Sequence, residues 1–254
     1  MADAKALTPE AMANWRNNRL LAAMPTIELA RLAPDLELVE LGMKAPIYDA
    51  HQPITHVYFP LDCVISVVAA LEGGTLIEVA TVGAEGVAGL PAFLGAVSSP
   101  HQSFCLVPGR ALRLDIDAMQ RFFLGDGVLH GLMHRYTEAV MVFLAQNVAC
   151  NRLHTTAVRC ARWLAQTHDR VGRDTFPLTQ EFLGEMLGVR RATVSLSAQV
   201  LQEAGLIRYS RGQITVLDRA GLHAAACDCY RIVRREFDKL PHSEPNNQGA
   251  TCEV

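Results

Sequence analysis

The fold of the C-terminal part is decided by the stretch Leu178-Thr-Gln-Glu-Phe-Leu-Gly-Glu-Met-Leu-Gly-Val-Arg-Arg-Ala-Thr-Val-Ser-Leu-Ser-Ala-Gln-Val-Leu-Gln-Glu-Ala-Gly205. Thr179 is a suitable N-cap for a first helix, and Glu181 lies near the positive end of its dipole. Two steeply crossing helices need a small residue where their backbones approach, and Gly184 provides it. Gly188 can take the positive φ of the turn between them. The stretch therefore predicts a helix-turn-helix.

The segment directly downstream predicts a β-hairpin. It is Leu206-Ile-Arg-Tyr-Ser-Arg-Gly-Gln-Ile-Thr-Val-Leu217, two strand-like runs around a tight turn at Ser210–Gln213. A hairpin in this place is the wing of a winged helix-turn-helix, a more specific combination than the two helices alone. We therefore expect a DNA-binding protein whose second helix enters the major groove.

The candidate DNA contacts lie on the second helix and on the wing. On the helix, Arg191 is the first choice for reading a base, because a guanidinium can bond guanine bidentately. Arg208 and Arg211 of the wing are expected to contact the DNA backbone. Each arginine could instead be a solvated surface side chain. The full set of expected contacts is Arg190, Arg191, Thr193, Ser195, Gln199, Arg208 and Arg211.

The N-terminal half has the pattern of an antiparallel β-structure. A helical lead-in, broken at Met24-Pro25, precedes short strand-like runs separated by glycine and proline turns. Many short strands with no long helix among them indicate a β-roll of the jelly-roll type. The expected strands are 36–41, 56–59, 64–71, 76–82, 103–107 and 111–116.

A long apolar helix is expected to follow, up to about Leu153, and its stripe has two interpretations. A spacing of 3.5 residues fits a dimer seam with Asn147 setting the register, and we favour this interpretation. The alternative is a core helix packed on its own β-roll, with Asn147 bonded to a backbone group. The expected dimerisation residues are Leu129, Met133, Tyr136, Val140, Phe143 and Asn147.

These patterns define an α+β chain with four parts. Residues 1–125 are expected to form the lead-in and the β-roll sensor domain, and 126–153 the dimerisation helix. Residues 154–240 are expected to form the winged helix-turn-helix domain. The polar segment 241–254, with paired asparagines, indicates a disordered tail.

The composition is that of an ordinary globular protein. Half of the 254 residues are hydrophobic and 19% are charged, and no apolar run approaches the roughly 20 residues of a membrane span. No secretory signal pattern is visible either, so we expect a cytoplasmic protein without a membrane partner. The net charge of −3 neither supports nor excludes DNA, because the local distribution of charge decides binding.

Metal and catalytic sites are not expected. The seven cysteines contain no C-x-x-C pair, so most are expected to fill the core, although Cys227-x-Cys229 could bind metal or respond to oxidants. His130 and His134, spaced i, i+4, could also bind metal, but we favour the interpretation that both side chains are solvated. A cupin-type metal-dependent enzyme is the main alternative, and it needs converging ligands that the sheet region lacks. A second alternative is a ligand-binding module that does not bind DNA. We therefore expect no enzyme, cofactor or metal.

The order of these parts resembles the Crp/Fnr family of bacterial transcription regulators, over nearly the whole chain. The likeness is strongest in His56-Val-Tyr-Phe-Pro, in Ile77-Glu-Val-Ala-Thr-Val-Gly-Ala-Glu-Gly-Val-Ala-Gly-Leu-Pro and in 178–217. The resemblance implies a cyclic-nucleotide-binding-like sensor, a homodimer on a palindromic operator and RNA polymerase as a partner. It also implies allosteric control by a signal in the β-roll, whose identity the sequence does not give.

Three departures from the family pattern narrow what the resemblance implies. The Gly-Glu-Leu and Arg-Ser segments of cyclic-nucleotide binders align with Ala88-Gly89-Leu90 and His101-Gln102, so tight cyclic AMP binding is not expected. Cysteines before Cys63 are absent, which argues against an N-terminal iron-sulfur cluster. In the second helix, Ala192 and Leu196 stand where an acid and a second arginine are found in well-known members. The operator sequence therefore does not carry over.

Overall fold

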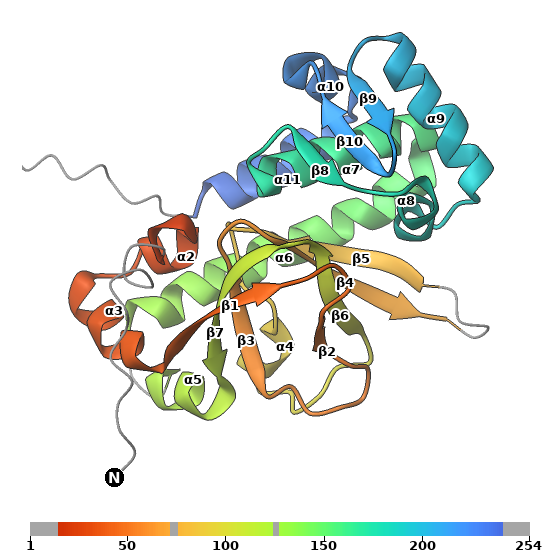
Figure 1. The fold of residues 1–254 in the computed structure, drawn as a ribbon. Helices are drawn as coiled ribbons and strands as arrows, with labels where there is room; N and C mark the ends of the chain where they lie inside the picture. Colours follow the sequence, from red (N-terminus) through yellow and green to blue (C-terminus); the bar gives the residue numbers. More distant parts are fainter. Residues whose placement is uncertain (1–14, 72–75, 124–126, 241–254) are drawn as a thin grey trace, which may run out of the picture.

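The computed structural model describes residues 15–71, 76–123 and 127–240. The predicted tail, 241–254, lies outside this part of the chain. The described residues form an α+β fold with a β-rich N-terminal region, a long helix and a C-terminal helix-turn-helix region, as the sequence predicts (Figure 1). None of the described helices is long and apolar enough to cross a membrane.

The β-roll consists of two antiparallel sheets. One has the strand order β1-β7-β3, from Leu36–Leu41, Gly109–Asp115 and His56–Pro60. The other has the order β2-β6-β4-β5, from Pro46–Tyr48, Gln102–Val107, Val64–Ala70 and Leu76–Val82. Buried apolar side chains of both sheets, such as Ile65, Cys105 and Ala111, pack together between them. The predicted runs thus fold into a sandwich, with β2 as an additional strand.

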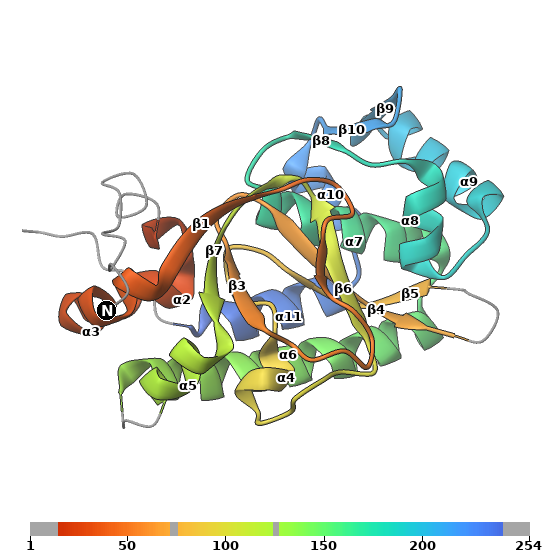
Figure 2. The same cartoon turned by 60° about the horizontal axis from the view of Figure 1, so that its bottom comes forward.

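Short helices surround the roll. The lead-in forms η1 (Trp15–Asn17), α2 (Arg19–Ala22), α3 (Thr26–Leu32) and η2 (Ala33–Asp35), and the predicted break at Met24-Pro25 separates α2 from α3. Asn18 caps α2 with its side-chain oxygen, and its amide donates to the carbonyls of Pro60 and Gly86. Two more helices, α4 (Leu90–Phe93) and α5 (Ile116–Phe123), lie beside the sheets (Figure 2).

The long helix α6 (Val128–Leu153) corrects the expected dimer seam. Leu129, Met133, Tyr136 and Phe143 are buried in a core made by their own chain, and Val140 packs against that core. The amide of Asn147 donates to the carbonyl of Val79, 2.9 Å away. The alternative interpretation of the stripe, a core helix with Asn147 bonded to backbone, therefore describes these residues.

The stripe of α6 is buried within its own chain because a helix near the end of the described residues packs on it. After α7 (Thr156–Val171) and α10 (Arg219–Ala225), helix α11 (Asp228–Asp238) runs back between α6 and α7 (Figures 1 and 2). Val233 and Phe237 of α11 join the core that contains Tyr136 and Phe143. The apolar stripe of α6 is thus covered by a segment that the sequence groups with the winged helix-turn-helix.

The winged helix-turn-helix itself contains two helices and a three-stranded sheet. The helices are α8 (Gln180–Leu187) and α9 (Arg191–Glu203). The sheet has the order β8-β10-β9, from Thr175–Pro177, Gln213–Val216 and Ile207–Ser210. Figure 1 shows α9 at the outer edge of the molecule, with α8 nearer to the β-roll.

Candidate nucleic-acid interface

The turn between α8 and α9 has the geometry that its glycines predict. The Thr179 hydroxyl caps α8 by accepting from the backbone N–H of Phe182, at 3.1 Å. A Cβ on Gly184 would lie 2.9 Å from the carbonyl oxygen of Val189, so the close crossing of the two helices requires glycine there. Gly188 has a φ of 64°, in the left-handed region. The helix-turn-helix is therefore fixed by local sequence.

The predicted contact residues of α9 differ in the exposure and the hydrogen bonding of their side chains. Arg190, the N-cap, and Arg191, the first helical residue, are exposed. Gln199 is exposed and pairs with Glu203 at 2.8 Å. Thr193 is half-buried. The two arginines thus stand at the start of α9, where a helix that enters a major groove N-terminus first presents its side chains.

The side chain of Ser195, an expected DNA contact, is half-buried and bonded within the domain. Its hydroxyl donates to the side-chain oxygen of Gln180, at 2.7 Å, and lies 3.1 Å from the carbonyl oxygen of Arg191. Because Gln180 begins α8, this bond ties the two helices together. Gln180 is a positioning residue that the sequence patterns did not single out, because it lies fifteen positions from its partner.

An apolar part of the exposed face was also missed. Leu196 and Val200, one turn apart on α9, have exposed fractions of 66% and 55%. Apolar side chains of this kind can contact the methyl groups of thymine in a major groove. The signal was the replacement of the family's second arginine by Leu196, which the sequence shows directly.

The wing arginines lie on a tight hairpin. Arg211 and Gly212, the two central residues of the β9–β10 turn, both have positive φ, as a two-residue type I′ turn requires. Arg208 and Arg211 are exposed, and they line an open polar hollow with side chains of β8 and β10. The hairpin thus carries two exposed cations on one small sheet.

The helix-turn-helix packs against the β-roll of its own chain through α8. The Phe182 ring lies 6.0 Å from the ring of Phe104 on β6, with Lys44 above it. The Ser66 hydroxyl on β4 lies 3.6 Å from the sulfur of Met186. Burial of these apolar groups holds α8 on the sheet and leaves α9 facing outward (Figure 1).

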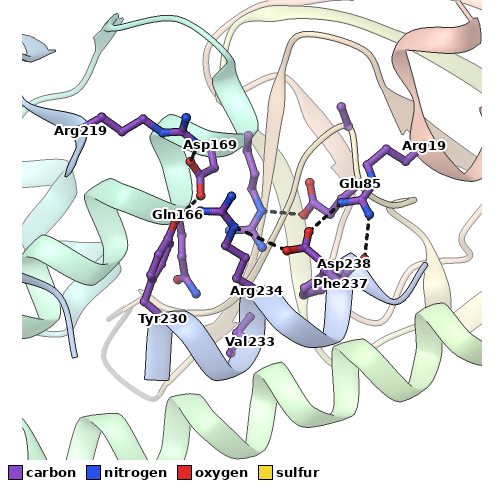
Figure 3. Close-up of a pocket in the computed structure, with 12 residues that line it drawn as sticks. Arg19, Glu85, Gln166, Asp169, Arg219, Tyr230, Val233, Arg234, Phe237 and Asp238 are labelled. Atoms are coloured by element: carbon purple, nitrogen blue, oxygen red, sulfur yellow. Dashed lines mark hydrogen bonds and ion pairs between the residues drawn. The ribbon is translucent and has the colours of Figure 1, made fainter. Parts of the chain in front are cut away.

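A polar junction fixes α7 and α11 to the other side of the roll (Figure 3). Arg170 pairs with Glu85 at 2.6 Å, and both side chains are largely buried, with 7% and 11% exposed. Asp169 accepts hydrogen bonds from Tyr230 and Arg219. Burial opposes ionisation of Asp169, but these two bonds outweigh it, so the pKa of this carboxyl is lowered. The junction is therefore a network of charges that are already paired.

A third contact, between the β-roll and α7, contains a carboxyl with a pKa near neutral. Glu78 of β5 accepts from the Trp163 indole N–H of α7, at 2.6 Å, and from the Ser66 hydroxyl. Burial raises the pKa of Glu78 to about 7, although both hydrogen bonds act to lower it.

We expect this carboxyl to make folding stability fall as the pH rises from about 4.5, its unfolded pKa, to about 7. The folded chain binds the proton more tightly in that window, so the protonated form carries the stability. The loss is on the order of 3 kcal/mol. Urea unfolding at several pH values measures it, and Glu78→Gln should flatten the profile. An equal slope in both proteins would contradict the assignment.

The comparison with protein families identifies the C-terminal unit. Residues 158–225 match the model of the Crp-like helix-turn-helix domain. The match ends before α11, which agrees with the packing of that helix on α6. No curated protein matches the chain in sequence.

Solved structures show the same overall fold. FixK2 from Bradyrhizobium japonicum is similar with a TM-score of 0.64 and 17% identity, over 76% of this chain and 98% of that one. A transcriptional regulator of the Crp/Fnr family from Eubacterium rectale gives 0.59 and 16%, over 82% and 98%. The CRP-family regulator TTHB099 from Thermus thermophilus gives 0.57 and 20%, over 74% and 96%.

The matched model shows that residues 158–225 form a Crp-like helix-turn-helix domain. The solved structures show that the chain as a whole has the fold of Crp/Fnr-type regulators, with a cyclic-nucleotide-binding-like β-roll before that domain.

Proposed function

We propose that the protein is a sequence-specific DNA-binding regulator that works as a homodimer on a palindromic operator. The observation that carries this proposal is the exposed pair Arg190 and Arg191 at the start of α9, beside a wing with Arg208 and Arg211. Four exposed cations, two at the start of α9 and two on the wing, would attract the DNA backbone, and the N-terminal end of α9 would read bases.

The test is selection of bound genomic fragments by the purified protein, followed by affinity measurement on the enriched site. We expect a palindrome with half-sites about one helical turn apart. Arg191→Ala should weaken binding to that site roughly 5- to 150-fold, because one bidentate guanine contact contributes about 1–3 kcal/mol.

Arg211→Ala is the matched control, because it removes a cation from the wing and leaves α9 intact. It should weaken binding to all sequences alike and reduce the salt slope by about 1. Equal losses on the selected site and on unrelated DNA for Arg191→Ala would contradict base reading. Enrichment of no sequence by the wild type, with or without cell extract, would contradict the whole proposal.

The proposed dimer surface lies on the face of α6 that the chain leaves uncovered. Met141, Leu144 and Val148 are 66%, 38% and 72% exposed, and they are spaced i, i+3 and i+7. This spacing forms one apolar stripe beside the residues that pack inside, and Leu144 at its edge also lines the cavity between the β-roll and α6. Two copies of the stripe can pack along a two-fold axis, which would set the α9 helices at the spacing of a palindrome.

Val148→Glu is expected to shift the protein from dimer to monomer at micromolar concentration, because each copy would bury an unpaired carboxylate. Analytical ultracentrifugation measures the change. Leu94→Glu, at an equally exposed leucine beyond α4, should leave the dimer intact. A monomeric wild type, or a dimeric Val148→Glu protein, would contradict this surface.

The proposed signal site is a cavity between the β-roll and α6. It has a volume of about 320 Å³, and valines, alanines, Tyr136 and Phe143 dominate its lining. His101 is the nearest approach to a cation in the lining, in agreement with the missing phosphate-binding arginine. An uncharged, largely apolar effector fits such a lining. The resemblance to Crp/Fnr regulators adds RNA polymerase as the partner that would read the bound dimer.

A further inference from the structure

Four metal-binding side chains meet where α6 passes into α7. Cys150 lies in the last turn of α6, and His154 follows as the residue that caps the helix. Cys227 and Cys229 stand at the start of α11. One potential ligand atom from each lies within 4.8 Å of all the others. Two segments more than seventy residues apart thus contribute a C-x₃-H pair and a C-x-C pair to one point.

The distances are those of one small ion. With bond lengths of about 2.3 Å to sulfur and about 2.05 Å to nitrogen, a tetrahedral zinc site separates two sulfurs by about 3.8 Å and sulfur from nitrogen by about 3.6 Å. The Cys150 and Cys227 sulfurs are 3.6 Å apart, and the Cys229 sulfur is 3.7 Å from Nδ1 of His154. A disulfide would require about 2.05 Å. These cysteines are free.

The surroundings of the four residues suit a bound metal. All three cysteines are buried. The side-chain amide of Gln146 donates to the Cys229 sulfur, at 3.2 Å, which is the kind of outer hydrogen bond that orients a thiolate ligand. Three thiolates around a divalent ion carry a net charge of about −1. Arg162 lies close enough to Cys150 for an electrostatic interaction, so a cation is available to offset that charge.

We propose that Cys150, His154, Cys227 and Cys229 bind one zinc ion in a closed tetrahedral site. Four protein ligands leave no open position, so the site is structural rather than catalytic. An iron-sulfur cluster fits less well, because its cysteines bind different iron atoms and lie farther apart than these sulfurs. The sequence alone does not bring these four residues together, because the two pairs become neighbours only through the return of α11.

The ion would join three elements at one point. It would hold the α6–α7 junction, where the sensor half passes into the DNA-binding half, to the first turn of α11. The four ligands converge only in the folded chain, so zinc would bind the folded state and not the unfolded one. Binding would therefore stabilise the fold.

The experiment begins with the full-length protein, purified under reducing conditions and without a metal-affinity step. We expect about one zinc per chain by elemental analysis. After removal of zinc with a chelator, Co²⁺ should give the thiolate charge-transfer and intense d–d absorption bands of a tetrahedral site, and Zn²⁺ should displace it. Cys229→Ser and His154→Ala should each lose roughly nine-tenths or more of the bound zinc, and Gln146→Ala should bind about ten-fold more weakly.

Cys160→Ser is the matched control, because Cys160 is a buried cysteine in the core of the helix-turn-helix half and belongs to no ligand group among the described residues. It should keep one zinc per chain. Circular dichroism checks that each variant is folded before its metal is counted. Three results would overturn the proposal: a folded wild type that binds neither metal at micromolar concentration, a Co²⁺ spectrum without thiolate bands, or a Cys150–Cys227 disulfide under reducing conditions.

Discussion

Replacing Glu85 by alanine is expected to lower the free energy of unfolding by about 3–5 kcal/mol. The substitution leaves the guanidinium of Arg170, on α7, largely buried without its carboxylate partner, which lies 2.6 Å away in the folded chain. Arg170 cannot turn into water easily, because it also stacks on the rings of Phe143 and Phe237. Urea unfolding followed by circular dichroism measures the loss.

An exposed ion pair provides the control for this prediction. Arg121 and Asp35 are 3.8 Å apart with most of Arg121 in solvent, so Arg121→Ala should cost less than about 1 kcal/mol. The double variant Glu85→Gln/Arg170→Met removes both charges and should be more stable than Glu85→Ala. Similar losses for Glu85→Ala and Arg121→Ala would show that burial of the Arg170 pair has no energetic weight.

Truncation of Phe237 to alanine should cost about 3–5 kcal/mol as well, through a cavity in the core. The ring is buried, and its centroid lies 6.2 Å from that of Tyr136 and 6.3 Å from that of Phe143. Because Phe237 is on α11 and its neighbours are on α6, the variant should also lose amide protection in α6. Hydrogen exchange and urea unfolding measure the two effects.

Lys239→Ala tests whether this effect depends on packing. Lys239 follows α11 directly, and its exposed side chain pairs only with Glu236 in the described contacts. Its removal should change stability by less than about 0.5 kcal/mol. Unchanged protection of α6 in the Phe237→Ala protein would mean that α11 does not close this core.

Local patterns in the sequence predicted the helix-turn-helix closely. Gly184, Gly188 and the Thr179 cap act within a few residues of their own position, so the sequence alone determines their geometry. The strand runs of the β-roll were equally local, whereas β2 and β8, with three residues each, were too short to give a pattern.

Features that depend on distant segments were not predictable in the same way. The stripe on α6 is compatible with a second copy or with the chain's own core, and only the position of α11 decides between them. For the same reason, Cys227 and Cys229 gave a weak signal until Cys150 and His154 were found beside them. The bond of Ser195 to Gln180 also spans two helices, so its positioning role was hidden.

The place of α11 in the core also sets the order in which the protein can be completed during synthesis. The apolar face of α6 is complete once Leu153 has been made, but Val233, Phe237 and Leu240, which cover it, are made much later. From position 153 to position 240 is 87 residues, about 4 to 17 s of translation at roughly 5–20 residues per second. During that time the core around α6 lacks the side chains of α11, although the core between the two sheets has all its residues. A shortened gene that ends after the wing would therefore yield a chain in which the core around α6 stays incomplete.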